Sequence, residues 1–449
     1  MAEPAKLDTH QKALDLNLDL TKFGSFAEIG AGQEVVRWFL VVGGASGTVA
    51  KSISAYDKEV SDDLYGAGAR YVSKERLQAM LDSEWTQLLN QLGKIRGAQT
   101  CFFSFVDTVA ARNFAGTNDP HGWVGLRFQQ QPGAPPNDII LHINMRDRSN
   151  VMEQEAIGIL GVNLIYAAFR QLQSKESFFG GVAQDVENRI ETDYVEVRGP
   201  AFESWEQRTL LAFLVSSGLA EAAYFPSSGS PMPPTDILYK KAVVLAPGRF
   251  EHVDQAHSEI HERLLASAIE ELRRELAGPK SEPIGFFCLS AMGLTPEESP
   301  PPLADLLQRI EALLARGGNV LLFRQRELYS MTDLVNRYTK EHVRFVVGLS
   351  LLVRVYEDRY SGLDGRLLEA LARLFAQNVR IYAYPMTVKD FRATLPETTA
   401  LGWEWTETNG WISADQLRMA PPMGYLYAYT LASKFLISMP TPAALGADA

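Results

Sequence analysis

Four polar residues suited to acid–base chemistry and anion binding lie between positions 107 and 142 of the sequence. His121 and His142 carry imidazoles that exchange a proton near neutral pH, and Asp107 is a further titratable group. Arg127 presents a planar fork of N–H donors that suits a phosphate or a carboxylate. We therefore take His142, His121 and Asp107 as candidate catalytic residues and Arg127 as a candidate substrate-binding residue. The alternative is a solvated sheet face with ordinary polar residues.

Three short apolar runs carry these residues and predict an antiparallel sheet. The runs are TCFFSFV, GWVGLRFQ and DIILHINM, and the last two are joined by QQPGAPPN, which suits a hairpin. Alternation along the strands places Arg127 and His142 on one less apolar face. The run from Glu153 to Phe169 is apolar almost all round, with Gly158 and Gly161 three residues apart. It predicts a buried helix that covers the apolar face of this sheet.

The second half of the chain alternates short apolar runs with amphipathic helical patterns. Among them, IGFFCL, NVLLF, VRFVVGL and VRIYAY read as strands. This rhythm predicts βαβ units and a parallel sheet, whose ligands bind beyond the carboxyl ends of the strands. The segments expected there are 290–295, 324–326, 348–350 and 385–389. Arg324 and Arg326 follow the strand NVLLF directly and are candidate anion contacts, the next place to search if Arg127 binds nothing.

The middle of the chain is harder to assign. It contains a helical run from Arg208 to Ser216, a strand pattern from Asp236 to Leu245 and a charged helix from His257 to Leu276. A strand at 236–245 sends Lys240 and Lys241 to opposite sides, so one of them is a candidate substrate-binding residue. We predict an α/β protein with three parts. Residues 1–185 form a mixed α+β domain with an antiparallel sheet, 186–283 an intervening region, and 284–449 an α/β domain with a parallel sheet.

Two further motifs resemble cofactor or metal sites. The stretch GGASG, from Gly43 to Gly47, lacks the third glycine and the βαβ context of a dinucleotide fingerprint. We expect a glycine turn between helices there, and no NAD(H) or NADP(H) binding. His257 and His261 share one helical face and His252 is near, but the order H-E-x-x-H is missing. We predict no metal.

Composition limits the partners and the compartment. The 449 residues carry 43 basic and 54 acidic side chains, a net charge of −11, which opposes sequence-independent binding to nucleic acid or to an anionic membrane. Cys101 and Cys288 are the only cysteines, too few for a disulfide framework and consistent with a reducing compartment. The start of the sequence lacks a basic segment followed by an apolar core. We therefore expect a cytoplasmic protein.

Several segments resemble a bacterial protein family of similar length, and the resemblance spans nearly the whole chain. They include FAEIGAGQEVVRWF, SAYDKEVSDDLYG, QEAIGILGVNLIYAAF and ISADQLRMAPPMGYLYAY. Members of this family carry names such as nicotinate-nucleotide adenylyltransferase or TonB-dependent receptor. The first name implies a nucleotide ligand. Adenylyltransferases of that kind have an H-x-G-H motif, and the nearest sequence here, DPHGW at 119–123, does not match it. The resemblance therefore transfers no catalytic residue.

Two hypotheses of function follow from the sequence. The first is an enzyme that acts on a phosphorylated or nucleotide-like small molecule, bound through the arginine, histidine and lysine residues named above. The second is a non-catalytic homo-oligomeric scaffold, favoured by the lack of any strict catalytic motif and by the aromatic segments GWEWTETNGW and GYLYAY. The sequence indicates no particular cofactor.

Overall fold

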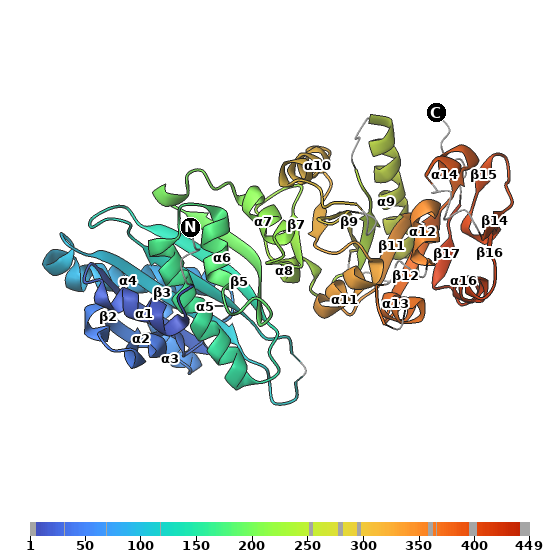
Figure 1. Ribbon diagram of the computed structural model, residues 1–449. Helices are drawn as coiled ribbons and strands as arrows, with labels where there is room; N and C mark the ends of the chain where they lie inside the picture. Colours follow the sequence, from blue (N-terminus) through green and yellow to red (C-terminus); the bar gives the residue numbers. More distant parts are fainter. Residues whose placement is uncertain are drawn as a thin grey trace. The chain divides into compact units, whose positions relative to one another are not determined.

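The computed structural model divides into two compact units, Met1–Ala220 and Glu221–Ala449 (Figure 1). It describes residues 6–440 except 31, 69, 117, 251–254, 277–281, 294–297, 358–361, 365 and 395–401. Of residues 255–258 it describes the backbone but not the side chains. The region 186–283 is shared between the units, since the first unit ends at Ala220. Within the described ranges, no helix has both the length and the apolar character needed to cross a membrane.

The first unit is built on a six-stranded mixed sheet in the order β2-β1-β3-β4-β5-β6. β1 is parallel to β2 and to β3, and the pairs β3–β4, β4–β5 and β5–β6 are antiparallel. The strands are β1 Lys22–Gly30, β2 Val49–Ile53, β3 Cys101–Ala110, β4 His121–Phe128, β5 Asn137–Met145 and β6 Ile190–Arg198. The predicted antiparallel sheet of three strands is confirmed as its centre, and β1, β2 and β6 extend it on both sides.

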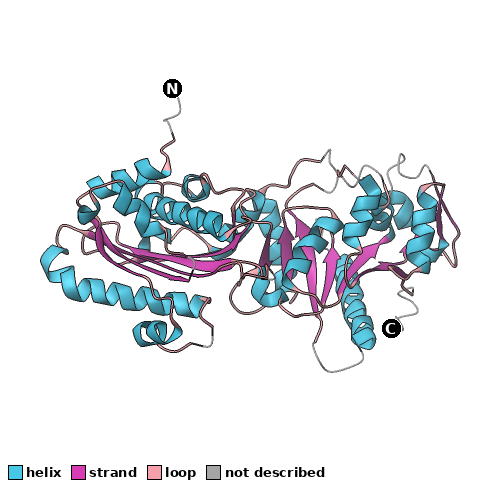
Figure 2. Ribbon diagram, turned by 90° about the horizontal axis from the view of Figure 1, so that it is seen from below, coloured by secondary structure: helices cyan, strands magenta, loops and turns pink. Residues whose placement is uncertain are grey.

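Helices cover both faces of this sheet, as Figure 2 shows edge-on. Those of the first unit are α1 Thr9–Leu18, α2 Val35–Val41, α3 Lys58–Tyr65, α4 Lys74–Arg96, α5 Asn150–Arg170, α6 Lys175–Ala183 and α7 Gln207–Ser216. α4 lies on one face, where Leu77 and Leu81 approach Gly125 of β4. α5 lies on the other, against α1 and α2, and the predicted buried helix is confirmed. Its Gly161 has no room for a Cβ, which would lie 2.3 Å from a methyl carbon of Val35.

The glycine stretch at 43–47 is a turn that follows a helix, as expected. α2 ends at Val41, and Gly43 and Gly44 adopt positive φ angles of 85° and 74°, which glycine takes without strain. The expected second helix is only a single 3₁₀ turn, Ala45–Gly47, and the chain then enters β2.

The second unit contains a seven-stranded sheet in the order β17-β12-β11-β8-β9-β10-β7. All neighbouring pairs are parallel except β10–β7, so the predicted parallel sheet is confirmed. The strands are β7 Ala222–Phe225, β8 Val243–Pro247, β9 Ile284–Ser290, β10 Val320–Phe323, β11 Val343–Gly348, β12 Val379–Tyr384 and β17 Leu436–Ser438. From β8 the chain builds outward to β9 and β10, then returns to the other side of β8 for β11, β12 and β17. This is the 3-2-1-4-5-6 order of doubly wound folds.

The helices of the second unit pack on both faces of its sheet. They are α8 Pro234–Leu238, α9 Gln255–Leu276, α10 Leu303–Ala315, α11 Leu328–Tyr338, α12 Leu349–Val355, α13 Arg366–Leu374, α14 Val388–Thr394 and α16 Met423–Ala432. One large core joins α11, α12 and α13 to the inward side chains of β8 to β12. α9 lies across β8, β9 and β11. Two short antiparallel strand pairs complete the C-terminal region: β13 Met386–Thr387 with β15 Trp411–Ile412, and β14 Trp403–Trp405 with β16 Leu417–Met419.

The strand predicted at 236–245 is wrong in its first half. The structure has the short helix α8, then a turn, and β8 begins only at Val243. Pro233 and Pro234 stand where a helix starts, a position that tolerates proline because the first N–H groups of a helix have no partner within it. Lys240 has a φ of 55°, which an extended strand does not allow. Lys240 and Lys241 therefore lie in a turn before the amino end of β8.

Candidate functional site

Arg127 and His142 lie on one face of the first sheet, as the alternation predicts. Arg127 is paired with Asp138 across β4 and β5, and His142 is paired with Trp123. Asp138 and His142 are four residues apart on β5, which corresponds to about 13 Å along an antiparallel strand. A single phosphate is too small to contact both side chains at that separation.

The guanidinium of Arg127 is held by two carboxylates. Nε and Nη2 donate to the two oxygens of Asp138 at 2.7 and 2.8 Å, and Nη1 donates to Asp82 of α4 at 2.8 Å. Burial acts to lower the pKa of Arg127, but the hydrogen bonds and charges of Asp138 and Asp82 outweigh it and raise the pKa. An anionic ligand at Arg127 must compete with this ion pair, and anion binding there stays a prediction.

His142 is oriented by a carboxylate that sequence reasoning missed. Its Nδ1 lies 2.6 Å from Oδ1 of Asp193 on β6, and the second oxygen of Asp193 accepts from Asn144 at 2.8 Å. The imidazole is 3% exposed and its ring centroid lies 4.9 Å from that of Trp123 and 5.6 Å from that of His121. A carboxylate that orients one ring nitrogen is typical of histidines that transfer protons, but this imidazole is almost wholly buried.

Asp107 points to the opposite face of the sheet from His142. Asp107 pairs with Val124 of β4, whereas His142 pairs with the preceding residue of β4, Trp123. Successive side chains of a strand point to opposite faces of the sheet, so Asp107 and His142 lie on opposite faces. Across the parallel pair of β1 and β3, Asp107 faces Glu28, and both are buried. Burial, and then the charge of Glu28, raise the pKa of Asp107 well above its usual range. The structure therefore does not bring Asp107 together with the two histidines.

The carboxyl edge of the second sheet contains a cavity of about 200 Å³. It lies beyond the ends of β8, β9 and β11, where the loop after β8 leads toward β9 and the loop after β11 leads toward β12. Ligands of doubly wound folds bind in the crevice at this reversal of strand order. The cavity is lined by Pro247, Gly248, Arg249, Cys288, Ser290, Arg326, Met331, Ser350, Leu351 and Arg354.

Three arginines from three loops or helices converge on this cavity. Arg326 follows β10, and its guanidinium lies 3.0 Å from Glu327 and donates to the carbonyl of Gly293 at 3.1 Å. Arg354 lies on α12, one turn beyond Ser350. Among the described residues, none forms a hydrogen bond or an ion pair with the Arg354 guanidinium, so a ligand can bind it without displacing a described carboxylate.

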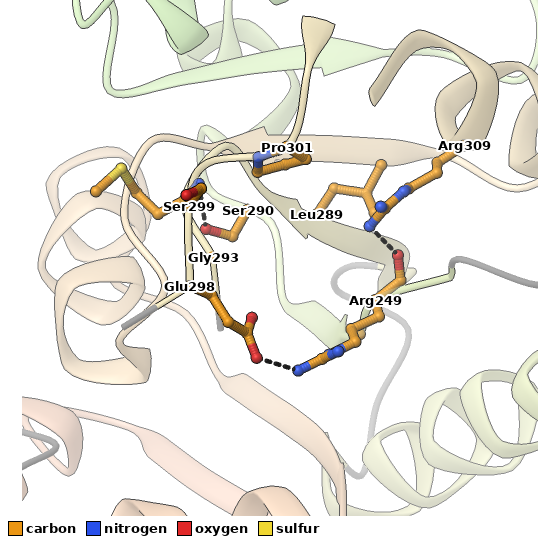
Figure 3. A pocket seen from close by; sticks show the side chains of 10 residues that line it. Arg249, Leu289, Ser290, Gly293, Glu298, Ser299, Pro301 and Arg309 are labelled. Atoms are coloured by element: carbon orange, nitrogen blue, oxygen red, sulfur yellow. Dashed lines mark hydrogen bonds and ion pairs between the residues drawn. The ribbon is translucent and has the colours of Figure 1, made fainter. Parts of the chain in front are cut away.

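The third arginine, Arg249, also borders a smaller neighbouring cavity of about 60 Å³, drawn in Figure 3. Its guanidinium donates to Glu298 at 2.6 Å, and its carbonyl accepts from Arg309 of α10 at 3.0 Å. Ser290, at the end of β9, accepts from the backbone N–H of Met292 at 3.0 Å. Gly248, Arg249 and Ser290 line both cavities, so the two are contiguous.

Cys288 contributes an apolar surface to the larger cavity. Burial raises the pKa of its thiol well above the usual range, so the sulfur stays protonated at neutral pH. Ser350 donates to the sulfur of Met386 at 3.3 Å. The lining thus offers cations, hydroxyls and apolar groups.

The sequence located part of this edge. Ser290, Arg326 and Ser350 come from three of the four segments expected beyond the strand ends. Arg324 is exposed and lies outside the lining, and residues 294 and 295 are outside the described part of the chain. Of the fourth segment, Met386 reaches the site only through Ser350.

Lys240 and Lys241 lie at the amino end of β8, the opposite end from the cavity. The ammonium of Lys240 lies 5.0 Å from the ring centroid of Tyr239. His252 and the side chain of His257 are outside the described residues, and His261 packs against Phe250 at 5.2 Å. Among the side chains that the structure describes, no three His, Cys, Asp or Glu residues converge as a metal site would require. The prediction of no metal stays a prediction.

Solved structures similar to part of the chain are competence- or damage-inducible proteins. The protein CihA from Agrobacterium tumefaciens is 18% identical over 37% of this chain and 98% of its own length, with a TM-score of 0.26. A CinA superfamily protein from Enterobacter cloacae is 11% identical over 37% of this chain and 96% of its own, with a TM-score of 0.27. No protein-family model and no curated protein matches the chain. These similarities identify no activity for it, and the family resemblance of the sequence stays a prediction.

Proposed function

We propose that the second unit binds a phosphorylated or nucleotide-like small molecule at the carboxyl edge of its sheet, and that the protein is an enzyme acting on that molecule. The observation that carries the proposal is the convergence of Arg249, Arg326 and Arg354 on one cavity at the reversal of strand order. Arginine is always charged and matches the geometry of phosphate oxygens. Three such groups favour a ligand that carries about two negative charges, which a phosphate monoester has.

The electrostatic balance of the cavity supports an anion. The described lining residues include three arginines and no carboxylate. Arg249 forms an ion pair with Glu298, and Arg326 forms one with Glu327. The positive charge of Arg354 has no such partner among the described residues. A bound phosphate would therefore supply a negative charge that the described residues do not place beside Arg354.

The lining also defines the chemistry available to the enzyme. Its thiol is buried and neutral, and each of its serine hydroxyls has a hydrogen-bond partner. The arginines, in contrast, stabilise negative charge that develops on a phosphoryl group or on a leaving oxygen. We therefore assign the arginines to binding and charge stabilisation, and no residue to the role of nucleophile.

Arg354→Ala tests this proposal directly. We expect any phosphate ester bound by the wild type to bind at least about tenfold more weakly to the variant, because a charge-assisted hydrogen bond contributes about 1.5–3 kcal/mol. Thermal shift with a panel of phosphate esters finds the ligand, and isothermal titration measures the dissociation constant.

The matched control is Arg274→Ala. It removes an arginine of α9 that is 75% exposed and lies outside both cavities. If both variants bind like the wild type, or if both weaken binding equally, the cavity is not the binding site.

One observation favours the alternative of a homo-oligomeric scaffold. Tyr425 and Tyr429 of α16 are 71% and 61% exposed, and they share one face of the helix at a spacing of four residues. Exposed aromatic pairs are enriched at protein interfaces. Mass measurement in solution tests it, since a single 49.8 kDa species at micromolar concentration argues against self-association through this face.

A further inference from the structure

The two contiguous cavities at the carboxyl edge of the second sheet limit the size of the ligand. Their volumes are about 200 and 60 Å³. A cavity of about 150 Å³ holds a benzene ring, which corresponds to about 25 Å³ for each non-hydrogen atom. At that density the larger cavity holds about eight such atoms and the smaller about two. A phosphate ester group uses about half of this space, so room remains for about three carbon atoms and their substituents.

The charges around the two cavities favour a ligand with a single anionic group. Three of the four arginines that line them each form an ion pair with a carboxylate: Arg249 with Glu298, Arg309 with Asp305, and Arg326 with Glu327. Arg354 is the fourth, and it has no carboxylate partner among the described residues. The phosphate of a ligand therefore belongs at Arg354. A second anionic group on the same ligand would have to break one of the three ion pairs.

The smaller cavity suits the hydroxyl groups of a ligand (Figure 3). Glu298 lines it, and its side chain is 39% exposed, so the carboxylate is accessible while it is paired with Arg249. A carboxylate has about four acceptor positions, so it can accept from a ligand hydroxyl and keep this ion pair. The hydroxyl of Ser290 accepts from Met292 and donates to no described residue, so it can donate to a ligand oxygen. A ligand hydroxyl, which both donates and accepts, matches these two groups.

We infer that the ligand is the phosphate ester of a short polyol of about three carbon atoms, whose phosphate is bound by Arg354 and whose hydroxyls are bound by Glu298 and Ser290. This inference rests on the proposed function and adds to it the class of ligand. Pro247 and Leu351, which are partly exposed and line the larger cavity, offer apolar surface to the carbon chain. Because such a ligand fills both cavities, a nucleoside in place of the polyol adds no favourable contact.

The experiment is isothermal titration of the full chain with four probes: glycerol 3-phosphate, propyl phosphate, 3-phosphoglycerate and AMP. Propyl phosphate has the same carbon chain without hydroxyls, and 3-phosphoglycerate carries a carboxylate that Glu298 repels. We expect glycerol 3-phosphate to bind at least about tenfold more tightly than either, because a hydrogen bond to a charged group contributes about tenfold or more to affinity. AMP should bind no more tightly than glycerol 3-phosphate. Equal binding of propyl phosphate or of 3-phosphoglycerate overturns the inference, and so does AMP binding that is about tenfold tighter.

Glu298→Gln tests the contact with the hydroxyls. We expect the preference for glycerol 3-phosphate over propyl phosphate to fall to about twofold, because a neutral amide makes a weaker hydrogen bond than a carboxylate. Propyl phosphate should bind no more weakly than to the wild type, since the removed charge repels its phosphate. The matched control is Glu262→Gln on α9, because the Glu262 side chain is 38% exposed, is paired with Arg316 and lies outside both cavities. An unchanged preference in Glu298→Gln, shown to be folded by circular dichroism, contradicts the inference.

Failure of the proposed function gives a different result. If no probe binds the wild type, or if Arg354→Ala leaves every affinity unchanged, the proposed function itself fails. If glycerol 3-phosphate and propyl phosphate bind equally and both bind more weakly to Arg354→Ala, the proposed function stands and only the inference about the polyol fails.

Discussion

Glu28 of β1 is predicted to make the stability of the first unit fall as the pH rises. Its carboxylate is 2% exposed and accepts from the backbone N–H groups of Val35 and Val36, at 2.7 and 3.4 Å, where α2 begins. Burial raises its pKa from the usual 4.5 to about 7, although these two hydrogen bonds act in the opposite direction. Asp107 faces it from β3, and one oxygen of Asp107 is buried without a hydrogen-bond partner among the described residues.

The sign and the size of the effect follow from these pKa values. Because the pKa of Glu28 is higher in the folded protein than in the unfolded chain, the folded state holds this proton up to a higher pH. The stability that this group provides is complete below pH 4.5 and is lost as the pH rises to about 7. Between pH 5 and pH 8 the loss amounts to about 2.5 kcal/mol, since each pKa unit corresponds to about 1.4 kcal/mol.

Glu28→Gln removes this titration and keeps the shape of the protonated side chain. We expect the free energy of unfolding of the variant, relative to the wild type, to increase by about 2.5 kcal/mol from pH 5 to pH 8. Taking the difference between the two proteins cancels the titrating groups that do not interact with Glu28. Urea unfolding followed by hydrogen-exchange mass spectrometry of β1 and β3 peptides measures the first unit separately.

The control is Glu34→Gln, which removes a carboxylate from the N-cap of the same helix α2. It reports the effect of removing a charge at that helix end while the buried pair of Glu28 and Asp107 stays in place. A difference between Glu28→Gln and the wild type that is the same at pH 5 and pH 8 would refute the assignment of a raised pKa to Glu28.

One further substitution in each unit tests a buried contact. Glu275→Ala should destabilise the second unit by about 3 kcal/mol, because it leaves the guanidinium of Arg344, whose side chain is 1% exposed, without its carboxylate. Urea unfolding measures this loss, and a loss under about 1 kcal/mol, which is typical of a surface pair, contradicts the prediction. Gly32→Ala should destabilise the first unit by about 1–3 kcal/mol, because the added Cβ would lie 2.2 Å from a carboxylate oxygen of Asp107. Gly180→Ala on α6, where nothing lies within 4 Å, should instead be neutral or stabilising in the same thermal unfolding assay.

Much of the fold could be predicted from local sequence patterns. β4 and β5 were recognisable because alternation and a proline-rich connection both act over a few residues. α5 was recognisable because its apolar positions cover the whole helix surface, and Gly158 and Gly161 indicate close packing. The parallel sheet of the second unit followed from the regular alternation of its strands and helices.

The missed elements depend on contacts between distant parts of the chain. β1 contains Gly24 and Ser25 and has a run of buried positions without alternation, because α helices cover both of its faces. β8 was placed too early because the apolar residues Ile237 and Leu238 belong to α8, and the left-handed conformation of Lys240 leaves no clear signal in the sequence.

The candidate site was harder to predict than the fold for the same reason. Ser290, Arg326 and Ser350 could be placed because they follow recognisable strands. Arg249 was missed because the end of β8 was misplaced. Arg354 was missed because it lies four residues beyond Ser350 on α12, and a helical turn brings it back to the strand end. Its position one turn further along the helix is the signal that could have found it.

The two units differ in how they neutralise charge at the turn after a strand, and this difference decides where a ligand is expected. After β1, the glycine-containing turn leads into α2, an arrangement that could attract an anion. There the carboxylate of Glu28 already accepts from Val35 and Val36, so the protein supplies its own anion. At the edge of β8 and β11 the balance is reversed, because Arg354 adds a charge that no described carboxylate neutralises. An external anion lowers the free energy of the second arrangement, whereas in the first it would have to displace the carboxylate of Glu28 from Val35 and Val36. The second sheet is therefore the place where a phosphate should bind.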